Sequence, residues 1–342
     1  MTNRYRLYKI KYNLCIMYTK LYKIQKIISD TKERQFAMEQ LTRKAYAKIN
    51  LGLDVLRRRP DGYHEVKMIM QTVDIYDTLT FRKLEEKDLS EKEKSSAEPV
   101  IRIYSDHETL PCNKSNLIYK AAALVMKTYE IKSGVAITLE KRIPIAAGMA
   151  GGSTDAAAVF HGLNELFELG MSPDEMKGMG VTIGADVPYC IMGGTALSEG
   201  IGEILTRLPA PPKAYLLVAK PDINVSTKFV YENLHADTLS YHPDIEGMVE
   251  AIEEGSLKGI TDRMGNVLET VTEKEYPVIA RIKEEMKKAG AENALMSGSG
   301  PTVFGIYRQK EIAQKAYGIL KEQGLAKQIF VTEFAASCTD ER

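Results

Sequence analysis

The residues whose types and spacing best suit a chemical function form a glycine-rich segment, PIAAGMAGGSTDAAAVF, at residues 144–160. The alternating stretch GVAITLEKRI before it predicts a strand, and the alanine-rich residues after it predict a helix. Glycine allows close backbone approach and positive φ, and the first turn of a helix presents free N–H groups to an anion. A tight turn that merely packs a strand on a helix is the simpler alternative. The hydroxyls of Ser153 and Thr154 favour a phosphate-binding loop.

Two better-known phosphate loops do not fit this segment. A P-loop ends in Gly-Lys-Ser/Thr, and no lysine follows Gly152. The dinucleotide fingerprint requires the spacing G-x-G-x-x-G, which Gly148, Gly151 and Gly152 do not have.

Polar residues that could work with such a loop lie far from it in the sequence. Lys48 and Asn50 share one face of a predicted strand, and Asp186 precedes a short apolar run in GADVPYCIMGG. Considered alone, Lys48 is expected to be an exposed strand lysine and Asp186 an ordinary turn aspartate. A functional Asp186 needs a partner cation, and Lys48 is a candidate. Tyr63 and His64 follow a turn, where such a pair is usually a surface or core feature.

The elements that must position these residues can be predicted from periodicity and breaker residues. Residues 42–84 predict strand, turn and strand, with the turn at Arg59-Pro60-Asp61-Gly62. The charged residues 84–98 predict an exposed loop. Strands are expected at VIRIYSD, YLLVA and QIFVTEF, and SGSGPT forms a second close-approach loop at residues 297–302. One helix is expected to follow the glycine loop and run to about residue 169, one to start at Pro173 with Ser172 as its cap, and one to follow Ser226. Further helices are expected at 116–129, 245–253, 257–270, 276–289 and 310–323.

Composition limits the class of protein. A chain of 342 residues predicts one large or two medium domains, and 44% hydrophobic with 27% charged residues is typical of a globular protein. The formal net charge of zero and the lack of a basic patch in residues 38–342 disfavour a nucleic-acid partner. The four cysteines are dispersed, without metal-ligand spacing, which favours a reduced, cytoplasmic setting: Cys15, Cys112, Cys190 and Cys338.

Residues 1–37 differ from the rest. They carry nine Lys or Arg against two acids, a net charge of +7, and lysines interrupt every apolar run that could span a membrane. A basic amphipathic segment, a targeting peptide and sequence upstream of the true start are the three alternatives. We favour the third, because a well-patterned segment follows Met38 directly.

Three motifs in this order resemble the GHMP small-molecule kinase family: the Lys48-Ile49-Asn50 strand, the glycine loop at 144–155 and the late SGSGPT loop. The resemblance extends from about Thr42 to the end. It implies an α+β, two-domain fold: an N-terminal ATP-binding domain at 38–197 with the glycine loop, and a C-terminal, ferredoxin-like α+β sandwich at 198–342. The motifs AKINLGL, RPDGYH and GADVP are most similar to a branch whose substrate carries a cytidine diphosphate group, in the non-mevalonate route to isoprenoids.

The resemblance also implies an activity and a set of site residues. The reaction is transfer of the γ-phosphoryl group of ATP to a 2-hydroxyl, with Asp186 accepting the proton, Lys48 lowering the pKa of the hydroxyl, and Mg²⁺ touching Ser153 or Thr154. Asn50 and Thr227 would bind the substrate, and Tyr63, His64 and Tyr231 would read the cytosine. The ATP loop comprises Pro144, Ile145, Ala146, Ala147, Gly148, Met149, Ala150, Gly151, Gly152, Ser153 and Thr154. A monomer or homodimer without a membrane partner is expected.

This sequence departs from the family pattern at a few positions. Ala146, Ala147 and Ala150 stand where glycine is common, and Asp155 stands where some relatives have asparagine. A carboxylate at Asp155 would repel phosphate unless Mg²⁺ intervenes or the side chain points away. The alternatives are a kinase for mevalonate-type or amino-acid alcohols and a non-catalytic binding protein on the same fold.

Overall fold

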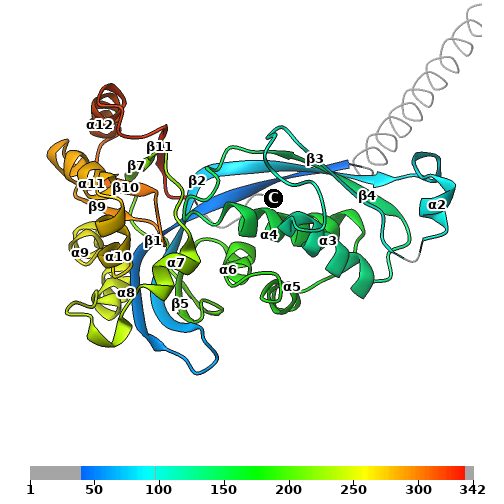
Figure 1. Cartoon of the computed structure of the whole chain (residues 1–342), viewed down its shortest axis with the longest axis horizontal. Coiled ribbons are helices and arrows are strands. Elements are labelled where there is room, and N and C mark those ends of the chain that lie inside the picture. Colours follow the sequence, from blue (N-terminus) through cyan, green and yellow to red (C-terminus); the bar gives the residue numbers. More distant parts are fainter. Residues whose placement is uncertain (1–39, 97, 336–342) are drawn as a thin grey trace, which may run out of the picture.

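The computed structural model describes residues 40–96 and 98–335. The prediction for residues 1–37 falls outside this range. The described chain folds into two sheets with helices, joined through two long strands that extend across the molecule (Figure 1).

The first sheet is built on an antiparallel hairpin of β1 (Gln40–Arg58) and β2 (His64–Leu84), which confirms the predicted strand, turn and strand. Gly62 closes the turn with a φ of +89°, a region that favours glycine. The order is β3-β4-β2-β1-β8, and β5 pairs with both β2 and β6. The remaining strands are β3 (Ile101–Ser105), β4 (Gly134–Glu140), β5 (Thr195–Gly200), β6 (Ile204–Leu208) and β8 (Gly265–Asn266).

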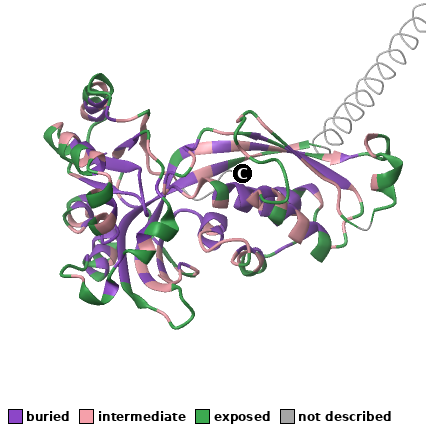
Figure 2. Ribbon diagram, viewed as in Figure 1, coloured by how far each residue is buried: buried purple, intermediate pink, exposed green. Residues whose placement is uncertain are grey.

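Four helices cover one face of this sheet (Figure 1): α3 (Leu117–Thr128), α4 (Gly151–Leu166), α5 (Pro173–Gly180) and α6 (Val187–Met192). The predicted cap at Ser172 is present, because its side chain accepts a hydrogen bond at the start of α5, and Asn116 caps α3 in the same way. Helix α4 packs closely on β2, where an added Cβ at Gly162 would lie 2.6 Å from the Phe81 ring. Buried residues follow the strands and the helix faces turned toward them (Figure 2).

The second sheet has the order β11-β7-β10-β9, and every neighbouring pair in it is antiparallel. Its strands are β7 (Tyr215–Lys220), β9 (Asn293–Met296), β10 (Val303–Tyr307) and β11 (Gln328–Glu333), and the helices packed on it are α11 (Val278–Lys288) and α12 (Lys310–Glu322). This order with two packed helices is the expected ferredoxin-like sandwich. The chain between β7 and β9 also forms α7 (Thr227–Glu232), η2 (Ala236–Thr238), α8 (Ile245–Glu253), α9 (Leu257–Asp262) and α10 (Glu269–Glu275).

One hydrophobic cluster joins the two sheets. It contains Ile49 and Leu51 of β1, Leu216 and Val218 of β7, and Met248 of α8, all fully buried. Burying a side chain of this size typically stabilises by about 1.5–3 kcal/mol. The central strand β1 is therefore packed from both parts of the molecule, which fixes them relative to each other.

Several sequence predictions need correction. Residues 85–96 are largely exposed, as expected, but they form η1 (Glu86–Asp88), where Glu85 supplies a capping box, and α2 (Glu91–Lys94), where Ser90 does. The helix predicted over 257–270 ends at Asp262, since Gly265 and Asn266 pair with β1 as β8. The first sheet continues through β6 to Leu208, beyond the boundary predicted at residue 197.

Within the described residues, no helix is long and apolar enough to cross a membrane.

Candidate active site

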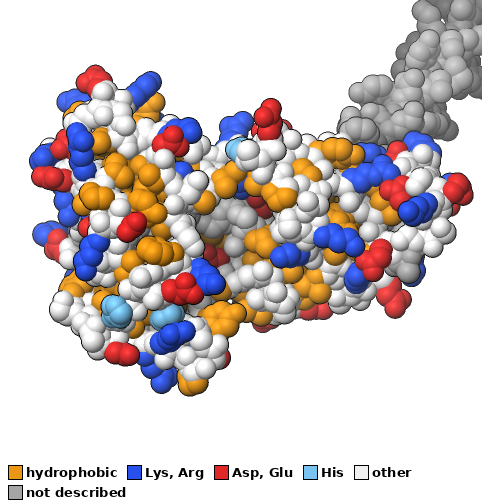
Figure 3. Space-filling view, viewed as in Figure 1, with side chains coloured by type: hydrophobic (Ala, Val, Ile, Leu, Met, Phe, Trp, Pro, Cys, Tyr) orange, Lys and Arg blue, Asp and Glu red, His pale blue; other side chains and the backbone are white. Residues whose placement is uncertain are grey.

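A cleft of about 1080 Å³ lies between the two parts of the molecule. Figure 3 shows the surface hollowed at this junction. Its walls come from β1 and β2, the glycine loop, the residues before α6, helix α7 and the late loop at 297–300. The three motifs are therefore brought together at one cavity, large enough for two small ligands.

The glycine loop connects β4 to α4, as the sequence predicts. Positive φ angles occur at Ala146 (+50°), Gly148 (+71°) and Ala150 (+57°). Gly151 is not among the positive-φ residues but is the first residue of α4, where an added Cβ would meet Ile143 Cγ2 and Lys141 Nζ at 3.1 Å each. Two of the three alanines that replace family glycines thus adopt a backbone region that favours glycine.

The late loop touches the glycine loop directly. The hydroxyl of Ser297 donates to the carbonyl oxygen of Gly148 at 2.9 Å, and an added Cβ at Gly148 would lie 2.2 Å from the carbonyl oxygen of Ser297. Real Cβ atoms do not approach a backbone oxygen so closely. Gly148 therefore needs to be glycine both for its φ and for this contact between the loops.

Asn266 holds the late loop, a role that sequence reasoning missed. The side chain is buried in β8, and its Nδ2 donates to the carbonyl oxygens of Met296 at 2.9 Å and Gly298 at 2.8 Å. Its Oδ1 accepts from the backbone N–H of Leu268. An isolated asparagine carries no sequence signal for such a role, because its partners lie about 30 residues further along the chain.

Lys48 and Asp186 face each other in the cleft, with Nζ and Oδ2 3.9 Å apart. Lys48 is only 5% exposed, so the expectation of an exposed strand lysine is wrong. The β1–β2 register shifts on both sides of this position, and such bulges re-aim side chains. The separation exceeds the 2.7–3.2 Å of a direct hydrogen bond but is within ion-pair distance. Asp186 keeps 35% of its side chain exposed and forms no capping bond with α6.

Asn50 orients Lys48 in this structure. Its Oδ1 accepts from Lys48 Nζ at 2.8 Å, and its Nδ2 contacts Met68 Sδ at 3.2 Å. The backbone N–H of Lys48 donates to the carbonyl oxygen of Met149. The lysine is thus fixed by a neighbouring side chain and by the glycine loop.

The predicted base-reading residues form another part of the same cleft. The rings of His64 and Tyr231 lie 5.0 Å apart at 39°, and Tyr63 lines the cleft with 59% exposure. Thr227 Oγ1 lies 2.8 Å from Ser299 Oγ, which joins α7 to the late loop. Burial and the charge of Arg58 lower the pKa of His64, so its imidazole is neutral near pH 7. Burial and the nearby Asp186 raise the pKa of Tyr231, which keeps its hydroxyl proton.

Not every predicted loop residue faces the cleft. Met149 is buried in the core, and the Thr154 hydroxyl donates to the carbonyl oxygen of Tyr46 at 2.7 Å on the opposite side of α4. Ser153 lines the cleft. Of the two hydroxyls considered for Mg²⁺, the geometry favours Ser153. The loop residues that do line the cleft are Pro144, Ile145, Ala146, Ala147, Gly148, Ala150, Gly151, Gly152 and Ser153.

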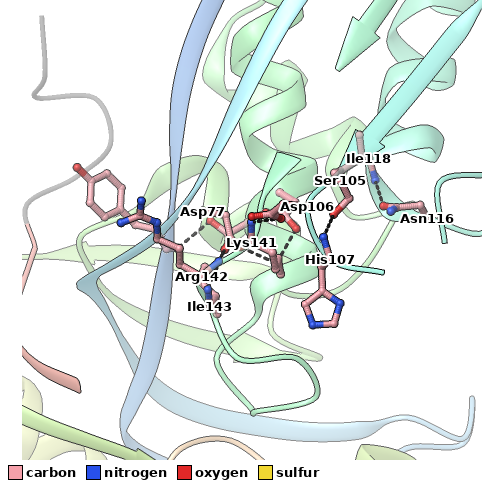
Figure 4. A network of polar contacts seen from close by, with 12 residues as sticks. Asp77, Ser105, Asp106, His107, Asn116, Ile118, Lys141, Arg142 and Ile143 are labelled. Atoms are coloured by element: carbon pink, nitrogen blue, oxygen red, sulfur yellow. Dashed lines mark hydrogen bonds and ion pairs between the residues drawn. The ribbon is translucent and has the colours of Figure 1, made fainter. Parts of the chain in front are cut away.

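Asp155 belongs to a buried polar cluster that the sequence did not reveal. Lys141 Nζ lies 2.8 Å from Asp155 Oδ2 and 2.5 Å from Asp77 Oδ2, and all three side chains are almost fully buried (Figure 4 shows Asp77 and Lys141). Burial and the charge of Asp77 outweigh Lys141 and raise the pKa of Asp155 to about 8. Despite that burial, flanking carboxylates raise the pKa of Lys141 and keep it charged. Asp155 is therefore largely protonated at neutral pH and lies beside a charged ammonium group, so the expected repulsion of phosphate does not arise.

No three His, Cys, Asp or Glu side chains lie close enough to hold a metal ion within residues 40–96 and 98–335. Mg²⁺ often keeps few protein ligands and is held largely by substrate phosphates. The residues present fit such an ion only if phosphate oxygens supply most of its ligands, together with Ser153.

Comparisons with known proteins agree with this geometry. Residues 116–194 match the family described as GHMP kinases N terminal domain, and residues 248–325 match GHMP kinases C terminal. A 4-diphosphocytidyl-2-C-methyl-D-erythritol kinase of Lachnoclostridium phytofermentans is 50% identical over 300 residues, which cover 88% of this chain and 99% of that protein. The enzyme of the same name from Geobacillus kaustophilus is 49% identical over 291 residues, covering 85% and 96%.

Solved structures show the same similarity. A crystal structure of 4-(cytidine 5'-diphospho)-2C-methyl-D-erythritol kinase matches with a TM-score of 0.71 and 29% identity, covering 86% of this chain and 100% of that one. A homoserine kinase from Cytophaga hutchinsonii matches with a TM-score of 0.68 at 21% identity, covering 87% and 95%. At that identity, the homoserine kinase supports the fold alone.

Proposed function

The chain belongs to the GHMP kinase family, and we propose that it transfers the γ-phosphoryl group of ATP to the 2-hydroxyl of 4-diphosphocytidyl-2-C-methyl-D-erythritol. The products are the 2-phosphate and ADP, in the non-mevalonate route to isoprenoid precursors. Relatives about 50% identical over nearly their whole length carry the name 4-diphosphocytidyl-2-C-methyl-D-erythritol kinase, which supports this substrate.

The observation that carries the proposal is the sharing of one cleft by three groups. The glycine loop, the Lys48–Asp186 pair and the His64–Tyr231 pair all line it. Phosphoryl transfer depends on in-line positioning and charge neutralisation more than on covalent chemistry. A cavity with a phosphate loop, an acid–base pair and a base-stacking pair has the parts that this bisubstrate reaction needs.

The glycine loop and the start of α4 bind the triphosphate in this proposal. Gly151 and Gly152 begin a 16-residue helix and line the cleft, and the first turn of a helix offers free N–H groups and a positive dipole end to an anion. Mg²⁺ bound to the phosphates would neutralise negative charge, and Ser153 would contribute a hydroxyl ligand.

Asp186 accepts the proton of the substrate 2-hydroxyl. As the oxygen attacks, a new P–O bond forms, and the bond between the γ-phosphorus and the β-phosphate oxygen breaks. Lys48 stabilises the developing negative charge on the attacking oxygen, and Asn50 keeps the ammonium in place. Asn50 would contact the substrate only by exchanging one of its present partners.

His64, Tyr231 and Tyr63 recognise the cytosine, by stacking and an edge hydrogen bond. The neutral imidazole of His64 has both a donor and an acceptor nitrogen. Stacking of a base on an aromatic side chain is typically worth about 1–3 kcal/mol. Thr227 begins the helix that carries Tyr231, and its hydroxyl is available to the substrate at the cost of its contact with Ser299.

A kinase for mevalonate or homoserine is the alternative within the family, and the aromatic wall argues against it, because those substrates have no nucleobase. A coupled ADP-release assay with the diphosphocytidyl substrate, mevalonate and homoserine decides between them. Preferred turnover of mevalonate or homoserine would refute the proposed substrate.

Three further points belong to the proposal. We place the N-terminal domain at 38 to about 208 rather than 197, because β5 and β6 pair within the first sheet. We also propose a cytoplasmic location, which the dispersed cysteines of the sequence favour. It acts as a monomer or homodimer.

A further inference from the structure

Lys141 is a buried cation that the proposed reaction does not use. It follows β4 directly and enters the wall of the cleft with its side chain only 5% exposed. Burying an ammonium group is costly unless it is paired and hydrogen-bonded. Two carboxylates from separate elements, Asp77 of β2 and Asp155 of α4, supply the partners.

The two carboxylates have different surroundings. Asp77 Oδ1 also accepts the backbone N–H groups of Arg142 and Ile143, so this aspartate stays satisfied and fixes the segment that leads into the glycine loop (Figure 4). The buried Oδ1 of Asp155 has no hydrogen-bond partner among the described residues. The other oxygen, Asp155 Oδ2, accepts a hydrogen bond from Lys141 Nζ at 2.8 Å.

The Lys141 ammonium also lies against the first residue of α4. An added Cβ at Gly151 would meet Lys141 Nζ at 3.1 Å, and Asp155 lies one helical turn further along the same helix. The lysine thus contacts the helix at its start and, through Asp155, one turn later. On its other side, the backbone N–H of Lys141 donates to Asp106 Oδ1 at 2.9 Å.

We propose that Lys141 is a positioning residue for ATP binding: clamped by Asp77 and Asp155, it fixes the first turn of α4 so that its N–H groups face the triphosphate. This inference rests on the proposed kinase function. It also explains how an aspartate can occupy the helix that receives phosphate, since its side chain is buried and held against an ammonium group.

The test measures direct binding of a non-hydrolysable ATP analogue and of cytidine 5′-diphosphate to the full chain. Lys141→Met should weaken analogue binding by about 10- to 100-fold, as expected for misplacement of about 1 Å, and leave cytidine diphosphate binding within about twofold. Arg142→Met is the matched control, because it removes an exposed positive charge from the next position and should change neither affinity.

A second pair of variants keeps the test decisive if Lys141→Met does not fold. Asp155→Ala removes the acceptor for Lys141 and should weaken analogue binding, whereas Asp155→Asn keeps an acceptor oxygen and should restore most of it. Thermal unfolding of each variant confirms the folded state. Equal losses for Asp155→Ala and Asp155→Asn, a folded Lys141→Met protein with parental analogue affinity, or equal weakening of both ligands would overturn the role. If the parent protein fails to bind cytidine diphosphate, the proposed substrate is wrong. The affinities of parent and variants for the ATP analogue would still test the role of Lys141.

Discussion

Asp186→Asn is the sharpest test of the chemistry, because the change removes a charge and little else. The carboxylate forms no capping bond with α6 and keeps 35% of its surface exposed. Its ion pair with Lys48 is partly screened by solvent, so we expect a stability loss below about 1 kcal/mol. Removal of a positioned general base commonly costs about 10²–10⁴-fold in rate, which corresponds to about 3–5 kcal/mol of activation free energy. The predicted loss is therefore kinetic, not structural.

The electrostatic coupling can be bounded from the structure. Two unit charges 3.9 Å apart interact by about 1 kcal/mol in water and about 4 kcal/mol at an effective dielectric constant of about 20. Lys48→Met removes the partner, and it also removes the charged hydrogen bond to Asn50, which is typically worth about 1.5–3 kcal/mol. The lysine variant should therefore lose both rate and thermal stability, in contrast to Asp186→Asn.

The assay is steady-state ADP release with the diphosphocytidyl substrate, for both single variants and the double variant. Because groups that act as a unit are non-additive, the double variant should be slower than the worse single variant by less than about tenfold. Binding of both substrates should stay near the parental value. An Asp186→Asn enzyme with ordinary kcat, or rate losses that multiply in the double variant, would refute the shared role even if the kinase function stood.

Four further outcomes follow from the structure. His64→Ala and Tyr231→Ala should each raise KM for the diphosphocytidyl substrate much more than KM for ATP, since stacking on a base is worth about 1–3 kcal/mol; equal increases would place these rings elsewhere. Gly148→Ala should abolish binding of an ATP analogue, because its Cβ would collide with a backbone oxygen at 2.2 Å, and parental affinity in a folded variant would reject the loop assignment. The raised pKa of Asp155 means that the folded protein keeps a proton which the unfolded chain releases near pH 3.8, so this stabilisation is full below that pH and is lost as the pH rises through about 8. Asp155→Asn should therefore show a smaller fall in Tm between about pH 5 and pH 9 than the parent, and parallel curves would contradict the shifted pKa. A chain beginning at Met38 should fold and keep its activity, and a large loss in either measurement would show that the extension is needed.

Local features could be predicted from the sequence because their causes are local. The turn at 59–62, the helix cap at Ser172 and the strand–loop–helix order around the glycine loop all depend on neighbouring residues. The positions of the positive φ angles in this loop were harder to predict. Of its three glycines only Gly148 has a positive φ, and the other two such residues are Ala146 and Ala150, since tertiary contacts can hold a residue in a region that its type disfavours.

Contacts between distant segments could not be predicted from residue types alone. The Thr154 hydroxyl points away from the cleft because Thr154 lies on the buried face of α4. Hydrophobic periodicity assigns a residue to a helix face only when the first residue of the helix is known. Lys141 and Asp77 are charged residues in ordinary contexts, and their pairing depends on β4 lying beside β2. Residue types alone suggested Lys48 as a candidate partner for Asp186, and the family resemblance gave the pair its roles, because nothing local brings the two residues together.

The strand β1 connects the glycine loop with the residues around Lys48, and so it can fix the relative positions of two substrates in one cleft. It carries Lys48 and Asn50, and its backbone bonds to the glycine loop through Met149. It also pairs with β8, where Asn266 holds the late loop, and that loop in turn contacts Gly148. The glycine loop, Lys48 and Asn50 are thus attached to the same buried strand. Since in-line transfer tolerates little displacement between phosphorus and oxygen, a single rigid strand that fixes both sides is a direct way to keep that distance constant.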